Sequence, residues 1–297
     1  MKKALFIFVL VFWPVWSWAW SAAGHGDIAI AALEQVPEKK RKEFQSILME
    51  GPWAKGNISW KTAASRAAAW PDRIRDMPLR KLFGQYGSGS VPPALQAYRK
   101  DSTKEWHYVN ALFIDTSGRI LEATQNASAK SCPPAQEGMM LEIWPHLFKA
   151  YEQAKDPRDK AIVLSFILHM VGDAYQPLHV LGSVDGGCRH DRGGNGFCTA
   201  PIVGFQAGLR CRESLHYLWD QGFGVFADDI SSKARFSGDP KSLTPALKEV
   251  RKVAESVYPK KSESPTSESY KNRSRKHVET VAKKASEHLA AALKTLP

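Results

Sequence analysis

The segment LSFILHMVGDAYQPLH, residues 164–179, places two ionisable groups in an apolar run. His169 and Asp173 are four residues apart, which puts both side chains on one face of a helix. The apolar residues around them, which should make this helix buried, are Ile162, Val163, Leu164, Phe166, Ile167, Met170 and Val171. A buried carboxylate needs a positive partner, and the sequence has no Lys or Arg between Lys160 and Arg189. A bound cation is the natural candidate, although such a pair alone is more often a surface ion pair.

Other segments carry His or Asp that could join the same cation. A second pair with helical spacing, His216 and Asp220, occurs in ESLHYLWDQG. His179 lies beyond Pro177, so the helix should end there and the chain should turn this imidazole back toward the same place. The remaining candidates are His25, Asp72 and His107. Each is more often structural when taken singly, but together they form a ligand set typical of zinc.

Apolar residues recur at helical spacing over most of the chain, which predicts one mainly α domain. The predicted helices are residues 26–35, 39–50, 62–76, 137–155, 158–175, 211–221, 241–257 and 270–295. Strand-like alternation is confined to short pieces such as His107 to Phe113. Residues 84–93 and 182–208 are predicted to be surface loops near the functional site, and residues 259–269 a flexible linker before the last helix.

Residues 1–19 have the pattern of a secretory signal peptide. Lys2 and Lys3 precede an apolar run, and Ser17 and Ala19 are small residues at the −3 and −1 positions of a cleavage site. Cleavage between Ala19 and Trp20 would leave 297 − 19 = 278 residues, with a net charge of 11 − 2 = +9. An uncleaved anchor is the alternative, but the apolar run is short for a membrane span. We therefore expect a secreted or periplasmic protein with no stable membrane partner.

Composition narrows the function classes further. The 43% hydrophobic content excludes wholesale disorder, and the net charge of +11 suits an anionic partner such as nucleic acid or a membrane surface, or a solvated face.

The four cysteines are Cys132, Cys188, Cys198 and Cys211, and they permit three disulfide pairings. A bond between Cys188 and Cys198 is favoured, because these two residues bracket a Gly-rich loop. None of them has CxxC spacing, so His is the more plausible zinc ligand.

In their order along the chain, these motifs resemble the zinc-dependent single-strand-specific nucleases of the S1/P1 family, which share a fold with bacterial zinc phospholipase C. The matching motifs are Trp20-(x)4-His25, Trp70-x-Asp72, His107-Tyr108, His169-(x)3-Asp173-(x)5-His179, Asp191-x-Gly-Gly-Asn195 and the run from Leu215 to Asp220. The resemblance implies a single-domain, multi-helix fold with three zinc ions in a cleft.

The resemblance also implies which residues hold each zinc ion. It assigns Asp72, His107, His169 and Asp173 to the first ion; His179, His216 and Asp220 to the second; and the amino group and carbonyl of Trp20, with His25 and Asp173, to the third. Asp173 would bridge two ions. Trp20 can offer its α-amino group only after the signal peptide has been removed.

For activity, the resemblance implies hydrolysis of single-stranded DNA and RNA to 5′-phosphorylated products, and of 3′-mononucleotides, by a monomeric enzyme whose metal-activated water attacks phosphorus. Asp72 would orient that water, and Arg75 would offer charge to the transition state. Tyr108 would stack on a base, Asn110 would face the base edge, and Asn195 would contact phosphate or sugar. The family often has Asp at the position of Asn110, which leaves base preference open.

Two other functions are weighed against this one. Zinc phospholipase C uses the same metal set, but it typically carries Glu where this chain has Asp220, and the Asp191–Asn195 loop is nuclease-like. A secreted, non-catalytic binder of zinc or polyanions would explain the basic charge and the histidines. Tyr108 argues against it, because a scavenger needs no base-stacking aromatic beside its metals.

Overall fold

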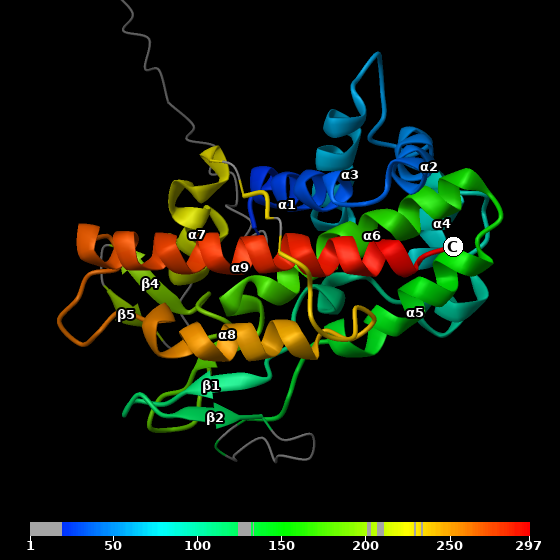
Figure 1. Cartoon of the computed structure of the whole chain (residues 1–297). Helices are drawn as coiled ribbons and strands as arrows, with labels where there is room; N and C mark the ends of the chain where they lie inside the picture. Colours follow the sequence, from blue (N-terminus) through cyan, green and yellow to red (C-terminus); the bar gives the residue numbers. More distant parts are fainter. Residues whose placement is uncertain are drawn as a thin grey trace, which may run out of the picture.

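Helices make up most of the structure, a computed structural model that describes residues 20–123, 132, 134–200, 203–206, 211–228, 230–232 and 234–297 (Figure 1). The mainly α class is thus confirmed. The α-helices are α1 (Ala22–Glu34), α2 (Glu38–Met49), α3 (Trp60–Ile74), α4 (Leu79–Tyr86), α5 (Met140–Gln153), α6 (Pro157–Tyr175), α7 (Leu215–Asp220), α8 (Thr244–Val257) and α9 (Glu268–Thr295). Short 3-10 helices are η1 (Pro93–Tyr98), η2 (Lys104–His107), η3 (Pro177–His179) and η4 (Gly222–Ala227).

Helix α6 lies at the centre of the fold and packs against α1, α3, α5, α8 and α9. Residues 161–175 are all buried, as expected for a helix that is apolar on every side. The side chain of Asp156 caps its first turn and Pro157 occupies the first helical position. Pro177 ends it, because a proline disfavours helical geometry at the residue before it, and Gln176 is extended.

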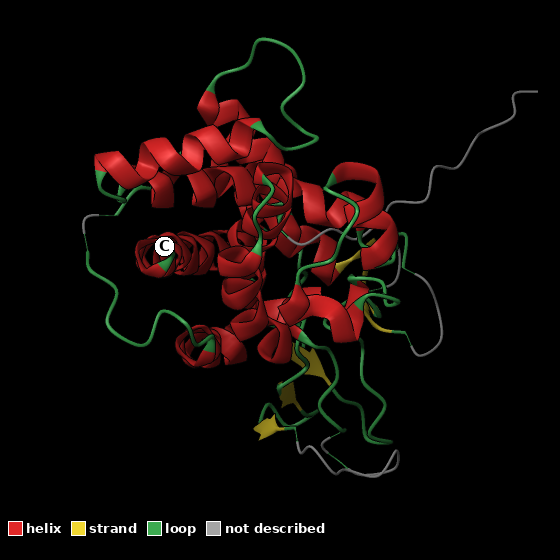
Figure 2. Ribbon diagram, turned by 90° about the vertical axis from the view of Figure 1, so that its right-hand side faces the viewer, coloured by secondary structure: helices red, strands yellow, loops and turns green. Residues whose placement is uncertain are grey.

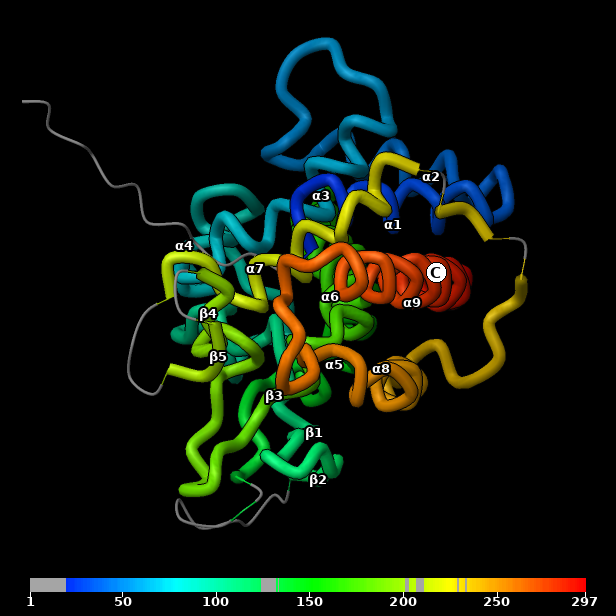
Figure 3. Tube along the Cα trace, turned by 90° about the vertical axis from the view of Figure 1, so that its left-hand side faces the viewer, coloured from blue at the N-terminus to red at the C-terminus, as the bar shows by residue number. Residues whose placement is uncertain are grey.

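Helix α9 crosses most of the molecule (Figure 1). Helices α1, α6 and α8 pack around it, as the end-on view in Figure 3 shows. Its start is capped by the side chain of Ser267. Two more serines cap helices that matter below: Ser21 at the start of α1 and Ser214 at the start of α7. Such caps fix the first helical turn, and in these two helices that turn carries His25 and His216.

Two small sheets lie toward one side of the helical body (Figure 2). In the first, β1 (Leu112–Ile114) pairs antiparallel with β2 (Ile120–Glu122) and parallel with β3 (Leu181–Ser183), with Leu112 opposite both Glu122 and Leu181. In the second, β4 (Phe197–Ala200) lies between β5 (Gly204–Phe205) and β6 (Glu213–Ser214). Because β1 and β3 run in parallel, the turns that precede them, η2 and η3, lie side by side.

Several predicted boundaries were wrong. The predicted helix over 211–221 begins only at Leu215, because residues 213–214 pair with β4. The predicted loop over 182–208 contains β4 and β5, and the predicted loop over 84–93 overlaps the end of α4, a short amphipathic helix that was not predicted. In the strand-like piece from His107 to Phe113, only residues from Leu112 onward form a strand, and His107 lies in a 3-10 helix.

The favoured disulfide pairing was also wrong. Cys198 is bonded to Cys211, with their Cα atoms 5.0 Å apart. The pairing follows from the second sheet, where Cys198 lies opposite Ser214, three residues after Cys211. Cys132 and Cys188 are both free thiols.

None of the helices in the described ranges combines the length and the apolar character that crossing a membrane requires. The first nineteen residues, on which the signal peptide is predicted, lie outside those ranges.

Candidate metal centre

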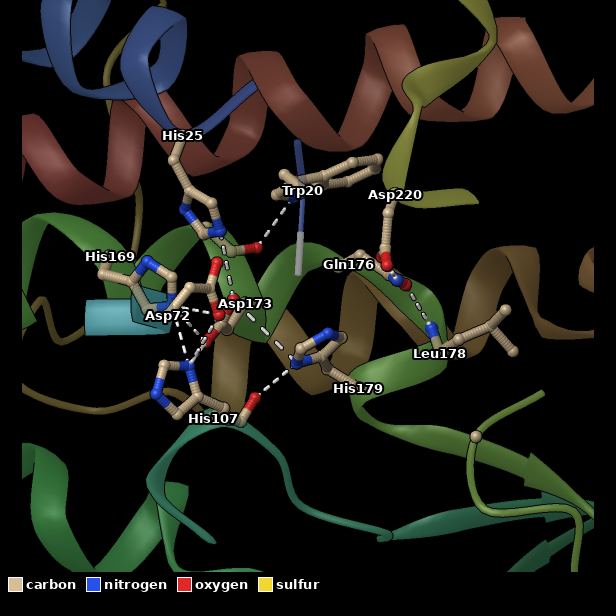
Figure 4. Close-up of polar contacts among 12 residues, drawn as sticks. Trp20, His25, Asp72, His107, His169, Asp173, Gln176, Leu178, His179 and Asp220 are labelled. Carbon is tan, nitrogen blue, oxygen red and sulfur yellow. Dashed lines mark hydrogen bonds and ion pairs between the residues drawn. The ribbon is translucent and has the colours of Figure 1, made fainter. Parts of the chain in front are cut away.

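Five separate segments bring histidines and aspartates to one buried place (Figure 4). They are the first turn of α1, the end of α3, η2, the second half of α6 with the following η3, and α7. Eight predicted ligands converge there and group in three sets: His25, Asp72 and His169; His107, His169 and Asp173; and His179, His216 and Asp220. Within each set, the possible ligand atoms all lie within 4.8 Å of one another.

Asp173 is the centre of this arrangement, and its side chain is wholly buried. Its two carboxylate oxygens face ring nitrogens from four directions. The distances are 3.3 Å to His25 Nε2, 3.1 Å to His107 Nδ1, 3.0 Å to His169 Nε2 and 3.9 Å to His179 Nδ1. A carboxylate with four imidazoles within 3.9 Å could be a ligand of more than one cation.

Asp72, at the end of α3, belongs to the first set and also approaches His107 of the second. Its Oδ1 lies 3.6 Å from His107 Nδ1 and 3.8 Å from His169 Nε2. Ligand atoms around a tetrahedral zinc ion, bound at 2.0–2.2 Å, are about 3.3–3.6 Å apart. The spacings around Asp72 and Asp173 bracket that range, so these residues fit zinc.

Three of the histidines are oriented by backbone carbonyls. The Nδ1 atom lies 2.7 Å from the Ala68 carbonyl oxygen in His169 and 2.6 Å from the Gly193 carbonyl oxygen in His216, and in His179 it contacts the carbonyl oxygen of His107. A proton on Nδ1 satisfies each contact and leaves the Nε2 lone pair available, which is the usual arrangement of metal-binding histidines.

Electrostatics favour neutral imidazoles that can bind a cation. Burial is the main cause that lowers the pKa of His25, His107, His169 and His179 and that lowers the pKa of His216 to about 4. Burial also raises the pKa of Asp173 well above its usual value. Several atoms of these residues are buried without a hydrogen-bond partner among the described residues: both ring nitrogens of His25, Nε2 of His107 and His179, and Oδ1 of Asp173. Such unpaired polar atoms are costly, and a cation bound between His25 Nε2 and Asp173 Oδ1, which lie 3.3 Å apart, would satisfy that pair.

The third set, His179, His216 and Asp220, is held by a residue that sequence reasoning missed. Gln176 is fully buried, and its Nε2 donates to Asp220 Oδ1 over 2.6 Å while its Oε1 accepts from the Leu178 amide. This amide therefore fixes the carboxylate that lies 3.6 Å from His216 Nε2. The only feature of the sequence that could have indicated Gln176 is its position between two predicted ligands, Asp173 and His179.

Trp20 lies between the sets and is fully buried. Its indole Nε1 donates to the Gly172 carbonyl over 2.9 Å, and the next amide, Ser21 N, donates to the Asp220 carbonyl over 2.7 Å. Gly172 also makes room for His25, because a Cβ atom there would lie 2.7 Å from His25 Nδ1. Gly172 is a second residue that the sequence analysis did not single out.

Arg75 follows the end of α3, one turn after Asp72. Its positive charge contributes to lowering the pKa of His107, His169, His179 and His216. The Arg75 charge therefore acts on four of the five imidazoles of the centre, all except His25.

The predicted substrate residues have different surroundings. Tyr108 is half-buried, and burial together with the charges of Glu105 and Glu137 raises its pKa. Asn110 is buried, and its side-chain nitrogen donates to Glu137 Oε2 over 3.2 Å. The Asn110 backbone amide also donates to the Glu137 carbonyl over 2.9 Å. Glu137 was not predicted from the sequence, yet it adds a carboxylate beside the aromatic ring.

The Asp191–Asn195 loop serves the site mainly through its backbone. Asn195 Nδ2 donates to the Arg192 carbonyl over 3.0 Å, so this side chain bonds within its own loop. Gly193 has a φ of +61°, and a Cβ atom there would meet the Leu178 carbonyl oxygen at 2.1 Å, so glycine permits the approach that orients His216. Buried Asp191 anchors the loop, since it accepts from the Ser183 amide and from the Tyr258 hydroxyl.

The model of the S1/P1 nuclease family matches residues 20–296, a range that starts at Trp20 and contains every residue of the candidate metal centre. Among curated proteins, nothing matches this chain.

Proposed function

This chain belongs to the S1/P1 nuclease family, and we propose that this nuclease hydrolyses single-stranded DNA and RNA to 5′-phosphorylated products with free 3′ hydroxyls, and 3′-mononucleotides to nucleosides and inorganic phosphate. The observation that carries the proposal is the convergence of four imidazoles on the buried Asp173 carboxylate, beside a third set of ligands and the Arg75 guanidinium. These groups supply what phosphodiester hydrolysis needs: sites for cations, a carboxylate to orient water, and positive charge for the phosphate.

We propose that these residues hold three zinc ions. Asp72, His107, His169 and Asp173 would hold the first; His179, His216 and Asp220 the second; and Trp20, His25 and Asp173 the third. Zinc bound at such sites lowers the pKa of water toward 7 and neutralises charge on phosphate oxygens. The unpaired Nε2 atoms of His25 and His179 and the unpaired Oδ1 of Asp173 support this assignment.

The side chains around the cluster have separate tasks in the proposed reaction. Asp72 accepts a hydrogen bond from the attacking water and directs its lone pair at phosphorus. Arg75 binds a non-bridging phosphate oxygen, and its interaction strengthens as negative charge develops in the transition state. Gln176 holds the Asp220 carboxylate in place near the leaving 3′ oxygen. Asp72 and Gln176 would thus orient reacting groups, and Arg75 would stabilise negative charge.

Substrate selection would follow from the depth of the cluster. Asp72, His107, His179 and His216 are at most 9% exposed, so a phosphate inside a rigid duplex would reach them poorly, whereas an unpaired nucleotide would extend its phosphate inward and stack its base on Tyr108. The Asn110 amide and the Glu137 carboxylate would then face the edge of that base. The loop that contains Asn195 would contact phosphate or sugar.

The disulfide of this protein is consistent with an enzyme that acts outside the cytoplasm. The Cys198–Cys211 disulfide is typical of oxidising compartments, and we propose that cleavage between Ala19 and Trp20 releases a monomeric enzyme to the periplasm or the exterior. The burial of Trp20 next to Gly172 and Asp220 supports a role for its freed amino group as a ligand.

The proposal is tested with mature protein and four nucleic acids: single-stranded and double-stranded DNA and RNA, each with and without a chelator. We expect rapid, chelator-sensitive release of 5′-phosphorylated products from both single strands and slow cleavage of both duplexes. Phosphatidylcholine vesicles are assayed in parallel. Release of phosphocholine without cleavage of any single strand would overturn the proposal in favour of a phospholipase.

A further inference from the structure

Two cysteines, Cys132 and Cys188, remain outside the Cys198–Cys211 bond. Although 56 residues separate them in the sequence (188 − 132), the Cys132 side chain hydrogen-bonds to that of Cys188. We propose that the mature protein joins Cys132 and Cys188 in a second disulfide, which ties together the segments that carry Glu137 and His190. The pairing requires the oxidising compartment proposed above, but it does not depend on the catalytic function.

Cys188 is held in a tight hairpin after β3. Val184 and His190 form a β-bridge across it, and the Cys188 amide donates to the Asp185 carbonyl over 2.9 Å. The Asp185 side chain accepts from the Arg189 amide over 3.0 Å and forms an ion pair with the Arg189 guanidinium at 2.6 Å. The turn therefore presents the Cys188 thiol in a fixed direction, which lowers the entropy lost when a bond forms.

Cys132 reaches this hairpin from the other segment. Its thiol senses the charges of Asp115, just after β1, and of Asp185, just after β3. Because β1 and β3 are parallel neighbours, those two positions lie at the same end of the sheet. Figures 1 and 3 both show the chain after β3 extending to the same edge of the molecule as the β1–β2 hairpin.

The surroundings favour a structural bond over a reactive thiol. The hydrogen bond to Cys188 is the main cause that raises the pKa of Cys132, to about 11, and the two carboxylates act in the same direction. A reactive cysteine instead has a lowered pKa beside positive charge. A thiol pair in an exported protein with one disulfide already formed matches a second structural bond.

Oxidation would fix the position of the base-binding residues. Glu137 follows Cys132 by five residues and contacts Asn110, while His190 and Asp191 follow Cys188 and lead to Gly193. The two segments already approach each other where His190 Nε2 lies 3.7 Å from Glu137 Oε1. A covalent link beside this weak ion pair would hold Glu137 in register with the loop that orients His216.

The bond forms by thiol–disulfide exchange. A disulfide of a small thiol such as oxidised glutathione, or of a protein oxidant, accepts the two electrons; the two cysteine thiols lose their protons, one S–S bond forms, and the oxidant leaves as two thiols. Atoms and electrons balance without any other reactant.

The test counts thiols in exported, mature protein that is denatured in an alkylating reagent without reductant. We expect no alkylated cysteine in the wild type, and a digest without reductant should contain the Cys132 and Cys188 peptides joined to each other. Cys132→Ser and Cys188→Ser should each expose one thiol, and the double variant none. Two alkylated thiols at Cys132 and Cys188, after equilibration with oxidised glutathione, would overturn the proposal.

Thermal unfolding provides a second readout that needs no catalysis. Without reductant, the double variant Cys132→Ser/Cys188→Ser should have a Tm roughly 4–8 °C below the wild type, because closing a long loop restricts the unfolded chain. With a phosphine reductant, which also opens Cys198–Cys211 in both proteins, the difference should vanish. Equal Tm values without reductant would contradict the bond. Loss of nuclease activity alone would bear only on the proposed function.

Discussion

At the scale of single residues, Asp173 is the group on which the centre depends. It is fully buried, and its oxygens face imidazoles from α1, η2, α6 and η3. A carboxylate in such surroundings lowers its free energy by binding a cation, since burial alone disfavours its charge. Replacing it should therefore affect more than one metal site.

Asp173→Asn should lower the hydrolysis rate of single-stranded DNA by at least about 100-fold and reduce bound zinc by more than one ion per chain, because amide oxygen is a weak zinc ligand. Activity and metal content are measured on the same sample. Asp101→Asn, at an exposed position, is the matched control and should behave as wild type. A near-normal rate for Asp173→Asn would exclude the assignment of Asp173 as the bridging ligand.

Gly172 offers a second test, of whether His25 is a metal ligand. Alanine in a helix is favoured over glycine by about 1 kcal/mol, but a Cβ atom at position 172 would lie 2.7 Å from His25 Nδ1 and push the ring away. We expect Gly172→Ala to lose one zinc ion and about 10–100-fold in rate, with helix content by circular dichroism unchanged.

Gly186→Ala is the control for this test, because a Cβ atom there meets no atom within 4 Å among the described residues. It should keep full metal content and activity. Three zinc ions in Gly172→Ala would show that His25 is not a ligand.

At the scale of elements, the predictions were best where local sequence alone sets the boundaries. Helix α6 was predicted at 158–175 and runs from Pro157 to Tyr175, because a capping Asp156 and a terminating Pro177 mark its two ends. Helix α7 was predicted too long, because the pairing of β6 with β4 determines its start. Such long-range pairing leaves no mark in the residues of the helix itself.

Site residues, too, were predicted where local spacing indicates them and missed where long-range contacts determine their role. His169 with Asp173, and His216 with Asp220, could be found from helical spacing. Gln176, Glu137 and Gly172 could not, because their roles arise from contacts with residues far away in sequence. The disulfide partner of Cys198 was missed for the same reason.

The Cys198–Cys211 bond ties β4 to β6 just before α7, which carries His216 and Asp220. The two cysteines are 13 residues apart, and closing a loop of that size stabilises the folded state by about 3 kcal/mol. Cys198→Ser/Cys211→Ser should therefore lower the Tm by several degrees and weaken zinc binding at the third set more than at the other two.

Metal titration of that double variant, with the Tm read in the same buffer, checks this prediction. A reductant should open both disulfides of the wild type and the Cys132–Cys188 bond of the variant, so under reducing conditions the two proteins should have the same Tm. An unchanged Tm would mean that the bond contributes no net stability and that α7 is positioned by its caps and packing alone.

At the scale of the whole molecule, the centre combines residues from the start of the described chain with residues up to α7. Helix α9 packs on α1 and α6 and so holds two of the contributing helices in place. Trp20, which the proposed cleavage would make the N-terminal residue, is buried in this assembly. Chain processing and metal binding should therefore be linked.

A protein that keeps one extra residue before Trp20 should bind one zinc ion fewer than the mature protein, because its α-amino group is converted to an amide. We expect its rate to fall by about 10–100-fold. Removal of the extra residue by a specific protease should restore both metal content and rate. Full metal content in the extended protein would show that the Trp20 amino group is not a ligand.

The central claim is that this buried His and Asp cluster holds the zinc ions on which hydrolysis depends. The most direct measurement is a zinc titration of metal-free mature protein, in which bound zinc and the rate of single-stranded DNA hydrolysis are followed together. The account predicts no measurable rate without metal and a rate that reaches its maximum when three zinc ions are bound per chain. Metal-free protein that hydrolyses single-stranded DNA at the full rate would contradict it.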